Sequence, residues 1–392
     1  MKITAVRTRP YVLKLTRPLG DANSPDGFDT TGGLAVFIDS DEGVTGVAVG
    51  SPGAEAAIES LSTLILGMDP RGVRGLWQKM VNASFKGGNE GAANGAISSI
   101  DVALWDLKAK LNGEPVWKTL GASARRVRAY ASGIDMPLSD AEMGAFYEQM
   151  AAGGVHGGKL KVGLDPESDL RRLGVMKDAL ETSGKRAELM VDSNEYWSPK
   201  QAIRHVSAFE EQLDLVWCEE PARRWDYRGL RKVSQSVKAA VATGENLNHI
   251  GDFLALMANE AVDVVQVGSG TSGITGALQV AEMAYGFELP VSMMNCPGNF
   301  MAHLAAVLPN HIMMEVVGAG REAVLEVDNH IEDGYIVLGD TPGLGVEFNT
   351  EKLEELAIDP TAARTDAVPS RRRRGAALYS VPAGEPAELE LE

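Results

Sequence analysis

Two lysines lie one residue apart in the segment GGKLKVG, residues 157–163. The segment is otherwise apolar or glycine, and its pattern predicts a β-strand. Residues i and i+2 of a strand point to the same side, so Lys159 and Lys161 should project together. Two buried ammonium groups side by side are costly unless an anion meets them. The pair therefore predicts a site for a negatively charged group.

Carboxylates close the next three predicted strands. Asp192 and Asn194 lie in VDSN, Glu219 and Glu220 in WCEEP, and Glu245 in ATGEN. A single acidic residue at a strand end is more often a helix cap or a solvated group. Three in succession, on strands ~4.8 Å apart, would converge and repel one another unless a cation lies between them. Oxygen ligands of this kind favour Mg²⁺.

The elements that must position these residues alternate between strands and helices. Eight short β-rich segments, each separated by roughly one helical stretch, lie at 127–133, 158–163, 187–193, 213–220, 239–245, 262–268, 289–295 and 311–317. This alternation predicts a parallel sheet, and eight repeats favour a closed α/β barrel. Functional residues of such barrels lie at the carboxyl ends of the strands, where the lysines and carboxylates are expected.

The segments outside the barrel have other patterns. Residues 1–125 predict an α+β unit, with a strand, a hairpin and then helices. We place the barrel at 126–325, a C-terminal segment of irregular structure and short strands at 326–364, and a flexible tail at 365–392. The tail contains RRRR, which is typical of a solvated segment.

Composition excludes several classes of partner. The chain has 37 Lys and Arg against 54 Asp and Glu, and a net charge of −17 argues against nucleic acids and anionic membranes. Its two cysteines, Cys218 and Cys296, form no disulfide framework and suit a reducing compartment. The N-terminus lacks the apolar core of a signal peptide, and no run of ~18 apolar residues occurs. We expect a cytoplasmic protein.

In their order and spacing, KLKVG, VDSN, WCEEP and ATGEN resemble the motifs of the enolase superfamily. More narrowly, they resemble its mandelate racemase-like branch. This branch is the mandelate racemase/muconate lactonizing enzyme family, which includes acid-sugar dehydratases. The resemblance covers roughly residues 1–350 and extends to AISSIDVALWDLKAKLNGEPVWKTLGA, SGITGAL, AHLAAVLPN and DTPGLGVE. It implies a modified TIM barrel, (β/α)7β, with an α+β capping domain built from the N-terminal region and from the C-terminal segment, which packs back on it.

The resemblance also implies roles for the site residues. Asp192, Glu219 and Glu245 would bind one Mg²⁺, which would hold a substrate carboxylate. Lys159 would help to neutralise that carboxylate, and Lys161 would take the proton α to it. We expect neighbouring positive charge to lower the pKa of Lys161, which would make it a base near neutral pH.

Other positions carry weaker expectations. Asn194 would bind substrate. Glu315 matches a family position that can hydrogen-bond the enediolate, and a structural role for it is equally open. His303 belongs to the motif AHLAAV, and we expect it to be structural.

The chain departs from the family at the second acid/base pair. Glycine near Gly268 replaces an aspartate, and Asn295 stands where a histidine would fall. The opposite face of the substrate therefore lacks an obvious base, which argues against two-base racemisation. Asn295 would orient the substrate. Cys296 would act as an acid or bind substrate, although a free cysteine is more often a small buried hydrophobe.

Residues 17–33 are expected to form a lid over the barrel. Asp21 and Asn23 lie in this segment, which has no basic residue after Arg17. If its acidic residues face the pocket, they suit hydroxyl or ammonium groups better than a second carboxylate.

The sequence thus predicts a Mg²⁺-dependent lyase that removes an α-proton and a β-hydroxyl from a monocarboxylic sugar acid or related hydroxy acid. A racemase, epimerase or cycloisomerase acting on a carboxylate such as an amino or imino acid derivative is one alternative. A non-catalytic metal- and ligand-binding relative is another. The expected partners are a small-molecule carboxylate and further copies of the chain, in a homo-oligomer of two to eight subunits.

Overall fold

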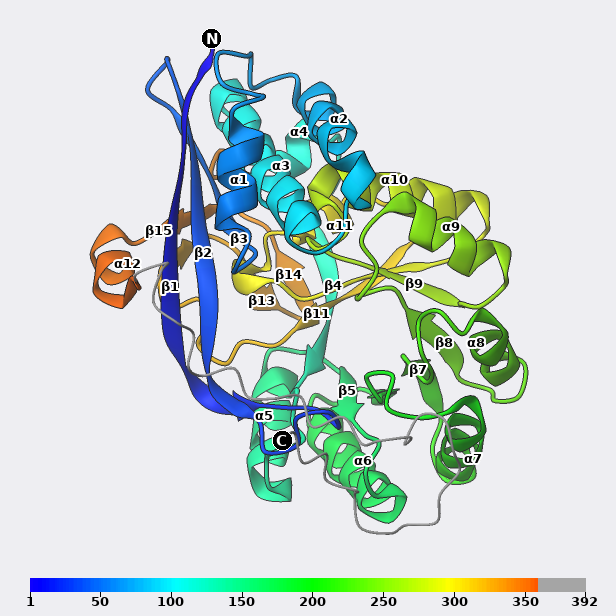
Figure 1. Cartoon of the computed structure of the whole chain (residues 1–392). Coiled ribbons are helices and arrows are strands. Elements are labelled where there is room, and N and C mark those ends of the chain that lie inside the picture. The colour runs from blue at the N-terminus through cyan, green and yellow to red at the C-terminus, as the bar shows by residue number, and fades with distance from the viewer. Residues whose placement is uncertain (359–392) are drawn as a thin grey trace, which may run out of the picture.

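The structure is a computed structural model that describes residues 1–358, so the predicted tail at 365–392 lies outside the described residues. The chain begins with a three-stranded antiparallel sheet in the order β1-β2-β3, formed by Ile3–Leu19, Phe28–Ser40 and Thr45–Gly50. Four helices and a 3₁₀ turn follow: α1 (Glu55–Ser62), α2 (Val73–Ser84), η1 (Phe85–Gly87), α3 (Gly91–Asn112) and α4 (Val116–Thr119). This part caps the rest of the molecule, and β1 and β2 run along one side of it (Figure 1).

Eight parallel strands then form the predicted barrel: β4 (Arg126–Ser132), β5 (Gly157–Lys161), β6 (Glu188–Asp192), β7 (Leu215–Glu219), β8 (Ala240–Thr243), β9 (Val264–Val267), β10 (Val291–Met293) and β11 (His311–Val316). The barrel is closed because β11 pairs in parallel with β4. The connecting helices are α5 (Asp140–Ala152), α6 (Pro166–Glu181), α7 (Pro199–Glu210), α8 (Tyr227–Ser234), α9 (Ile250–Ala258), α10 (Gly273–Gly286) and α11 (Ala302–Ala305), with the 3₁₀ turn η2 (Pro297–Asn299) before α11. Seven helices between eight strands confirm the (β/α)7β prediction.

The register of the barrel brings the predicted site residues to one level. Lys161 of β5 pairs with Asp192 of β6, and Asp192 pairs with Glu219 of β7. Glu315 of β11 pairs with Tyr130 of β4, which closes the ring. Because inward-facing residues alternate along a strand, Lys159 projects into the barrel one step below Lys161.

Large side chains fill the barrel interior beneath this level. Tyr130, Met190 and Trp217 belong to a buried cluster, and the rings of Tyr130 and Trp217 meet edge to face at 5.2 Å. Lys159 Nζ lies 5.7 Å from the centre of the Tyr130 ring. Since the interior is packed rather than open, ligands can enter only from the mouth of the barrel.

The last described elements contact both parts of the molecule: β12 (Leu325–Val327), β13 (His330–Glu332), β14 (Tyr335–Val337), β15 (Val346–Phe348) and α12 (Thr350–Leu356). β14 extends the sheet antiparallel to the start of β4. β15 pairs with β12 and contacts β3, while α12 packs against β1, on its outer side in Figure 1.

A buried carboxyl group joins the cap to the barrel. Asp101 of α3 accepts hydrogen bonds from the backbone N–H (2.8 Å) and the hydroxyl (2.6 Å) of Thr275, in the first turn of α10. Ser272, at the N-cap position of α10, makes no side-chain capping bond. A side chain 174 residues away therefore satisfies the end of this helix.

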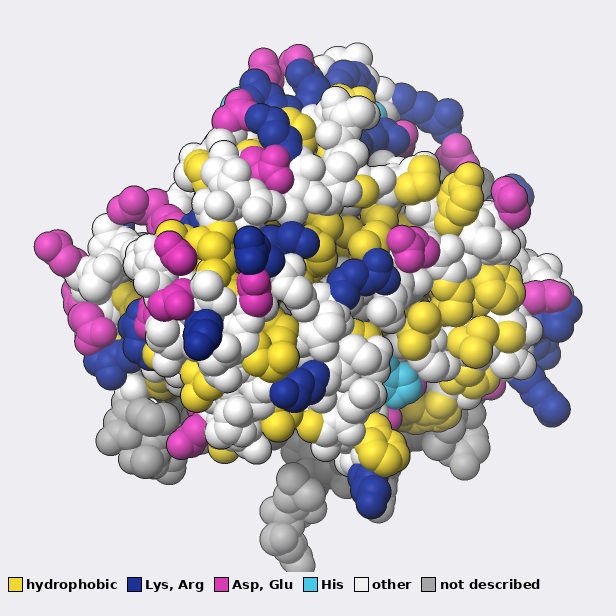
Figure 2. Space-filling view, turned by 90° about the horizontal axis from the view of Figure 1, so that it is seen from above, with side chains coloured by type: hydrophobic (Ala, Val, Ile, Leu, Met, Phe, Trp, Pro, Cys, Tyr) yellow, Lys and Arg dark blue, Asp and Glu magenta, His cyan; other side chains and the backbone are white. Residues whose placement is uncertain are grey.

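The surface carries mixed charge. Basic and acidic side chains lie interspersed over the face drawn in Figure 2, without a continuous basic area on that face. Among the described helices, none is both long and apolar enough to cross a bilayer.

Candidate active site

Lys161 lies at the end of β5, and its ammonium group has two hydrogen-bond acceptors. Its Nζ donates to Oδ2 of Asp192 (2.5 Å) and to Oδ1 of Asn194 (2.8 Å). Only 5% of the lysine is exposed. Burial acts to lower the pKa of Lys161, but Asp192, with smaller effects from Glu245 and Glu219, raises it above its ordinary value. Lys159 acts to lower the pKa of Lys161, as expected from the sequence, but the carboxylate of Asp192 is in direct contact with Lys161 and outweighs the second ammonium group.

Lys159 is fully buried and surrounded by carboxylates. Its Nζ lies 2.5 Å from Oε1 of Glu219, 3.0 Å from Oε1 of Glu315 and 3.5 Å from Oδ2 of Asp192. Burial acts to lower the pKa of Lys159, and these carboxylates raise it well above the ordinary value. Lys159 is therefore a fixed positive charge that holds three acidic side chains together.

The two glutamates of the WCEEP segment occupy different environments. Glu219 is bound at Oε1 by Lys159 and at Oε2 by Nε1 of Trp217 (3.1 Å). Glu220 accepts from Nδ2 of Asn246 (2.7 Å) through Oε1, while its buried Oε2 has no hydrogen-bond partner among the described residues. Burial and repulsion from Glu245 raise the pKa of Glu220 well above its usual range.

Glu245 follows β8 and is partly exposed. Its Oε1 accepts from Nδ2 of Asn194 (3.4 Å) and of Asn246 (3.1 Å). Burial, followed by repulsion from Asp192, raises its pKa. Glu245 is thus linked through Asn194 to Lys161.

The charge balance of this site fits a divalent cation. Four carboxyl groups lie around the ammonium groups of Lys159 and Lys161, those of Asp192, Glu219, Glu245 and Glu315. Glu220 lies close enough to Glu245 and Asp192 for their charges to repel. Burial and mutual repulsion raise the pKa of Glu219 and Glu245, which shows that negative charge there is in excess. The donors are all carboxylate oxygens, the type that Mg²⁺ prefers.

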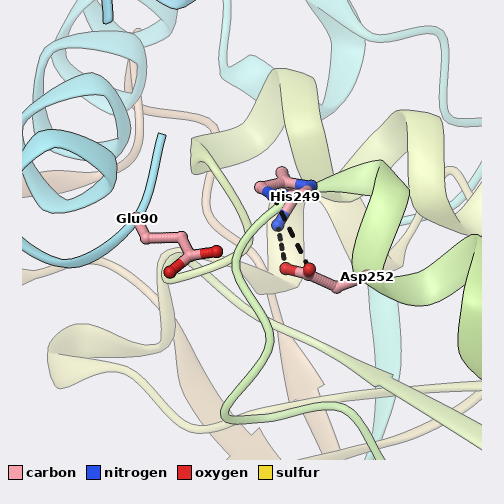
Figure 3. Close-up of side chains that lie close together, drawn as sticks. All are labelled: Glu90, His249 and Asp252. Atoms are coloured by element: carbon pink, nitrogen blue, oxygen red, sulfur yellow. Dashed lines mark hydrogen bonds and ion pairs between the residues drawn. The ribbon is translucent and has the colours of Figure 1, made fainter. Parts of the chain in front are cut away.

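Among the described residues, one group of acidic and histidine side chains has donor atoms close enough to share an ion, and it lies outside this site. One donor atom each of Glu90, His249 and Asp252 lies within 4.8 Å of the others (Figure 3). The backbone N–H of Gly251 donates to Nδ1 of His249, so the proton of a neutral ring lies on Nε2, 3.6 Å from Oδ1 of Asp252. A metal would need a free lone pair at Nε2. His249 and Asp252 instead form the capping box of α9.

A second chain of hydrogen bonds runs from Lys159 to the opposite side of the mouth. Nδ2 of Asn295 donates to Oε2 of Glu315 (2.5 Å), and Nη1 of Arg321 donates to Oδ1 of Asn295 (2.7 Å). Burial acts to raise the pKa of Glu315, but Lys159, Lys161 and the bond from Asn295 lower it to about 2. These contacts favour the ionised form of Glu315.

The side of the mouth near β9 and β10 has weak acid/base potential. Gly268 brings no side chain there, and Asn295 does not titrate. Burial raises the pKa of Cys296 to about 12, and its Sγ accepts the backbone N–H of Met301 (3.3 Å). His303 is buried, accepts from the backbone N–H of Trp117 and has a pKa lowered by burial to about 4, in line with a structural role.

The lid contacts the site through one of its two predicted residues. Nδ2 of Asn23 donates to the backbone oxygen of Asn194 (3.0 Å). Oδ1 of Asp21 instead accepts the backbone N–H groups of Asn23 and Ser24, which stabilises the turn of the lid. Asn23 therefore joins the turn between β1 and β2 to Asn194, the residue that accepts from Lys161, and Asp21 stabilises the turn itself.

Three adjoining cavities of about 240, 290 and 430 Å³ lie between the cap and the barrel mouth. Ser269 and Asn295 line both the first and the second, and Glu245 and Asn246 line both the second and the third. Joined, they fall in the ~300–1,000 Å³ range of small-molecule sites.

Tyr11 and Arg321 are among the lining residues that have no counterpart in the sequence-based predictions. They line the first cavity, from β1 and from the segment after β11. Neither lies in a recognisable motif, and Arg321 is six residues beyond Glu315 along the chain. The one feature of the sequence that could have indicated Arg321 is its place just after the last predicted barrel strand.

Comparison with known proteins agrees with this architecture. Residues 29–121 match the model of the mandelate racemase/muconate lactonizing enzyme N-terminal domain, and residues 142–352 match that of the enolase C-terminal domain-like family. The chain belongs to the mandelate racemase/muconate lactonizing enzyme family of the enolase superfamily.

Its relatives in this family are enzymes of more than one reaction class. The chain is 31% identical to a 3,6-anhydro-α-L-galactonate cycloisomerase of Streptomyces coelicolor, over 91% of this chain and 99% of that protein. It is 32% identical to an L-talarate/galactarate dehydratase of Salmonella typhimurium, over 72% and 73% of the two chains. A crystal structure of a racemase from Streptomyces coelicolor with bound magnesium superposes with a TM-score of 0.82 at 30% identity, covering 91% of this chain and 100% of that one.

Proposed function

We propose that the protein is a Mg²⁺-dependent lyase that removes water from a sugar acid or a related hydroxy acid. The observation that carries this proposal is the position of Lys161, which contacts Asp192 at 2.5 Å and is 5% exposed at the mouth, whereas Lys159 is fully buried. On the opposite side of the mouth, Gly268 and Asn295 have no titratable side chain, and burial raises the pKa of the neighbouring Cys296 to about 12. One base on one face supports elimination more than inversion.

The residues of the chain have separate tasks in this proposal. Mg²⁺, bound by Asp192, Glu219 and Glu245, supplies positive charge for the oxygens of the substrate carboxylate. Lys161 accepts the α-proton, and it can do so only as the neutral amine, once the charge of Asp192 is offset. Lys159 holds Glu219 and Glu315 in place and balances their charge.

In the proposed step, Lys161 both accepts the α-proton and returns it to the leaving hydroxyl group. The electrons of the broken Cα–H bond form the Cα=Cβ double bond, and the Cβ–O bond breaks. The hydroxyl leaves with the proton that Lys161 received, as water. The resulting enol becomes a 2-keto acid.

The test is a panel of sugar acids and hydroxylated amino acids incubated with the protein and Mg²⁺ in D₂O. NMR follows the α-proton, and a carbonyl reagent follows keto-acid formation. Exchange of the α-proton with loss of water supports the lyase. Exchange with inversion at the α-carbon would make the protein a racemase or epimerase, and absence of exchange with every acid despite Mg²⁺ binding would make it a binding protein.

Cycloisomerisation is the second candidate, favoured by the 31% identity to the cycloisomerase over nearly the whole length of both chains. In that reaction Lys161 would remove the same α-proton, and the oxygen that leaves Cβ would stay tethered as part of a former ring. The mass of the product distinguishes the two reactions, because only the lyase product is lighter than its substrate by one water.

The homo-oligomeric assembly and the cytoplasmic location stay predictions.

A further inference from the structure

The first cavity at the barrel mouth is bordered by several hydroxyl groups. Four of the described residues that line it carry one: Tyr11, Thr31, Ser51 and Ser269. Ser269 and Asn295 also line the second cavity, which reaches Glu245. A molecule that has one end at Glu245 can therefore extend past Asn295 into the first cavity.

The hydroxyl group of Tyr11 is open to this cavity. Only 2% of the residue is exposed, and its hydroxyl has no hydrogen-bond partner among the described residues. The buried polar side-chain atoms that lack a partner do not include this oxygen, so its surface is not closed off by the protein. Because Tyr11 lines the first cavity, that open surface belongs to the cavity. A phenol in this position is unsatisfied unless water or a ligand meets it.

Packing fixes the ring that carries this hydroxyl. Tyr11 lies opposite Gly33 in the β1–β2 pair, and a Cβ at residue 33 would collide with the hydroxyl end of the ring. The ring of Phe348 meets the ring of Tyr11 edge to face at 6.3 Å between centroids. Leu13 and Leu353 belong to the same buried cluster. The hydroxyl thus has a fixed position, which recognition of a single oxygen atom requires.

The phenol of Tyr11 is a hydrogen-bond donor near neutral pH and not a base. Burial raises its pKa to about 12, so the group keeps its proton. A neutral phenol can donate one hydrogen bond and accept another. It is therefore suited to hold a neutral oxygen-bearing group in place, while proton abstraction stays with Lys161.

We propose that Tyr11 is a binding residue of this active site, whose hydroxyl donates a hydrogen bond to one hydroxyl group on the carbon chain of the substrate, in the first cavity. This rests on the proposed function, which places the substrate carboxylate at Asp192, Glu219 and Glu245. Tyr11 comes from the cap, so the cap distinguishes between acids that react alike at the metal. An acid that lacks the contacted hydroxyl leaves the phenol unpaired and binds more weakly.

Tyr11 also has a structural role that the test must separate from binding. Its ring covers Gly33 and packs against Phe348. Tyr11→Phe keeps this ring and removes only the hydroxyl. A packing defect would weaken every ligand, whereas loss of the hydrogen bond weakens only the ligands that carry the contacted hydroxyl.

The experiment measures binding to protein in which Lys161→Ala prevents turnover. Calorimetry with Mg²⁺ present first ranks the five- and six-carbon sugar acids of the panel. The acid that binds most tightly is then compared with its deoxy forms, each of which lacks one hydroxyl at carbon 4, 5 or 6. Every ligand is measured before and after Tyr11→Phe. Tyr285→Phe is the matched control, because Tyr285 is 60% exposed on α10.

We expect Tyr11→Phe to weaken binding of the parent acid about 3- to 10-fold, the usual value of one hydrogen bond. One deoxy form should already bind more weakly than the parent, and Tyr11→Phe should leave its affinity within about 2-fold. Tyr285→Phe should change no affinity. Equal weakening of the parent and of every deoxy form by Tyr11→Phe would make the tyrosine structural and overturn the proposal. Unchanged affinity of the parent, or failure of every acid to bind, would also overturn it.

The outcome is separable from that of the proposed function. Binding that depends on the Tyr11 hydroxyl, without α-proton exchange in the unmodified protein, would reject the lyase and keep the binding role of Tyr11. Elimination with the same kcat/KM before and after Tyr11→Phe would keep the lyase and reject that role.

Discussion

Nζ of Lys161 lies 2.5 Å from Oδ2 of Asp192, across one register position of the β5–β6 pair. The proposed base is therefore in direct contact with a proposed metal ligand. Any change in the charge of Asp192 changes the pKa of Lys161, because opposite charges at this distance favour the ionised form of both groups. This contact links metal binding to the protonation state of Lys161.

The first prediction concerns Lys161 itself. Lys161→Ala should slow α-proton exchange of a substrate about 10²–10⁴-fold, because it removes the proton acceptor at the mouth. NMR in D₂O measures the exchange, and calorimetry should show that the variant still binds Mg²⁺. Lys177→Ala, at a surface lysine paired with Glu181, is the control. Exchange at the wild-type rate in Lys161→Ala would remove Lys161 from the mechanism.

The second prediction separates the two adjacent glutamates. Glu219→Gln should weaken Mg²⁺ binding more than Glu220→Gln, because Glu219 shares its register level with Asp192 whereas Glu220 is bonded to Asn246 beyond the strand end. Calorimetric titration of Mg²⁺ into each variant measures the difference. The opposite order of affinities would assign the ligand to Glu220.

The third prediction concerns the lid. Asn23→Ala removes the bond to the backbone oxygen of Asn194 and should raise KM by about 3- to 10-fold, the usual value of one hydrogen bond, with a smaller change in kcat. Asp29→Ala, at an exposed position just beyond the lid turn, is the control and should leave KM unchanged. Equal effects of the two substitutions would show that this contact does not position the lid.

The fourth prediction is a pH dependence of stability. Burial raises the pKa of Asp101 from 3.8 to about 7, although its bonds to Thr275 oppose the shift. Between these two values the folded chain keeps a proton that the unfolded chain has released. The contribution of Asp101 is therefore fully present below about pH 4 and is lost as the pH rises through 7, by up to about 4 kcal/mol of the free energy of unfolding.

Urea denaturation between pH 4 and pH 8 measures this dependence. Asp101→Asn should make the decline of the free energy of unfolding with pH shallower, whereas Asp214→Asn, at an 80% exposed side chain, should not. Asp106 and Asp169, whose pKa burial also raises, act in the same direction in all three proteins, so the difference in slope is the readout. Parallel curves for wild type and Asp101→Asn would contradict the prediction.

The sequence by itself determined the barrel and the approximate place of the chemistry. Alternation of short apolar strands with helices is a local pattern, and so is the two-residue period that puts Lys159 and Lys161 on one side of β5. Carboxylates at successive strand ends follow from the same pattern, because parallel strands end at one edge. These features need only the spacing of residues along the chain.

The tertiary structure alone decided which charges meet and which group each polar atom serves. Closure of β11 on β4 brings Glu315 to Lys159, the β5–β6 register sets Asp192 against Lys161, and the chain after β11 brings Arg321 into the cavity beneath the cap. The pKa of Lys161 depends on these contacts, because Asp192 raises it while Lys159 lowers it. Electrostatic interactions depend on distances of a few ångströms and on burial, and neither is a property of a local sequence pattern.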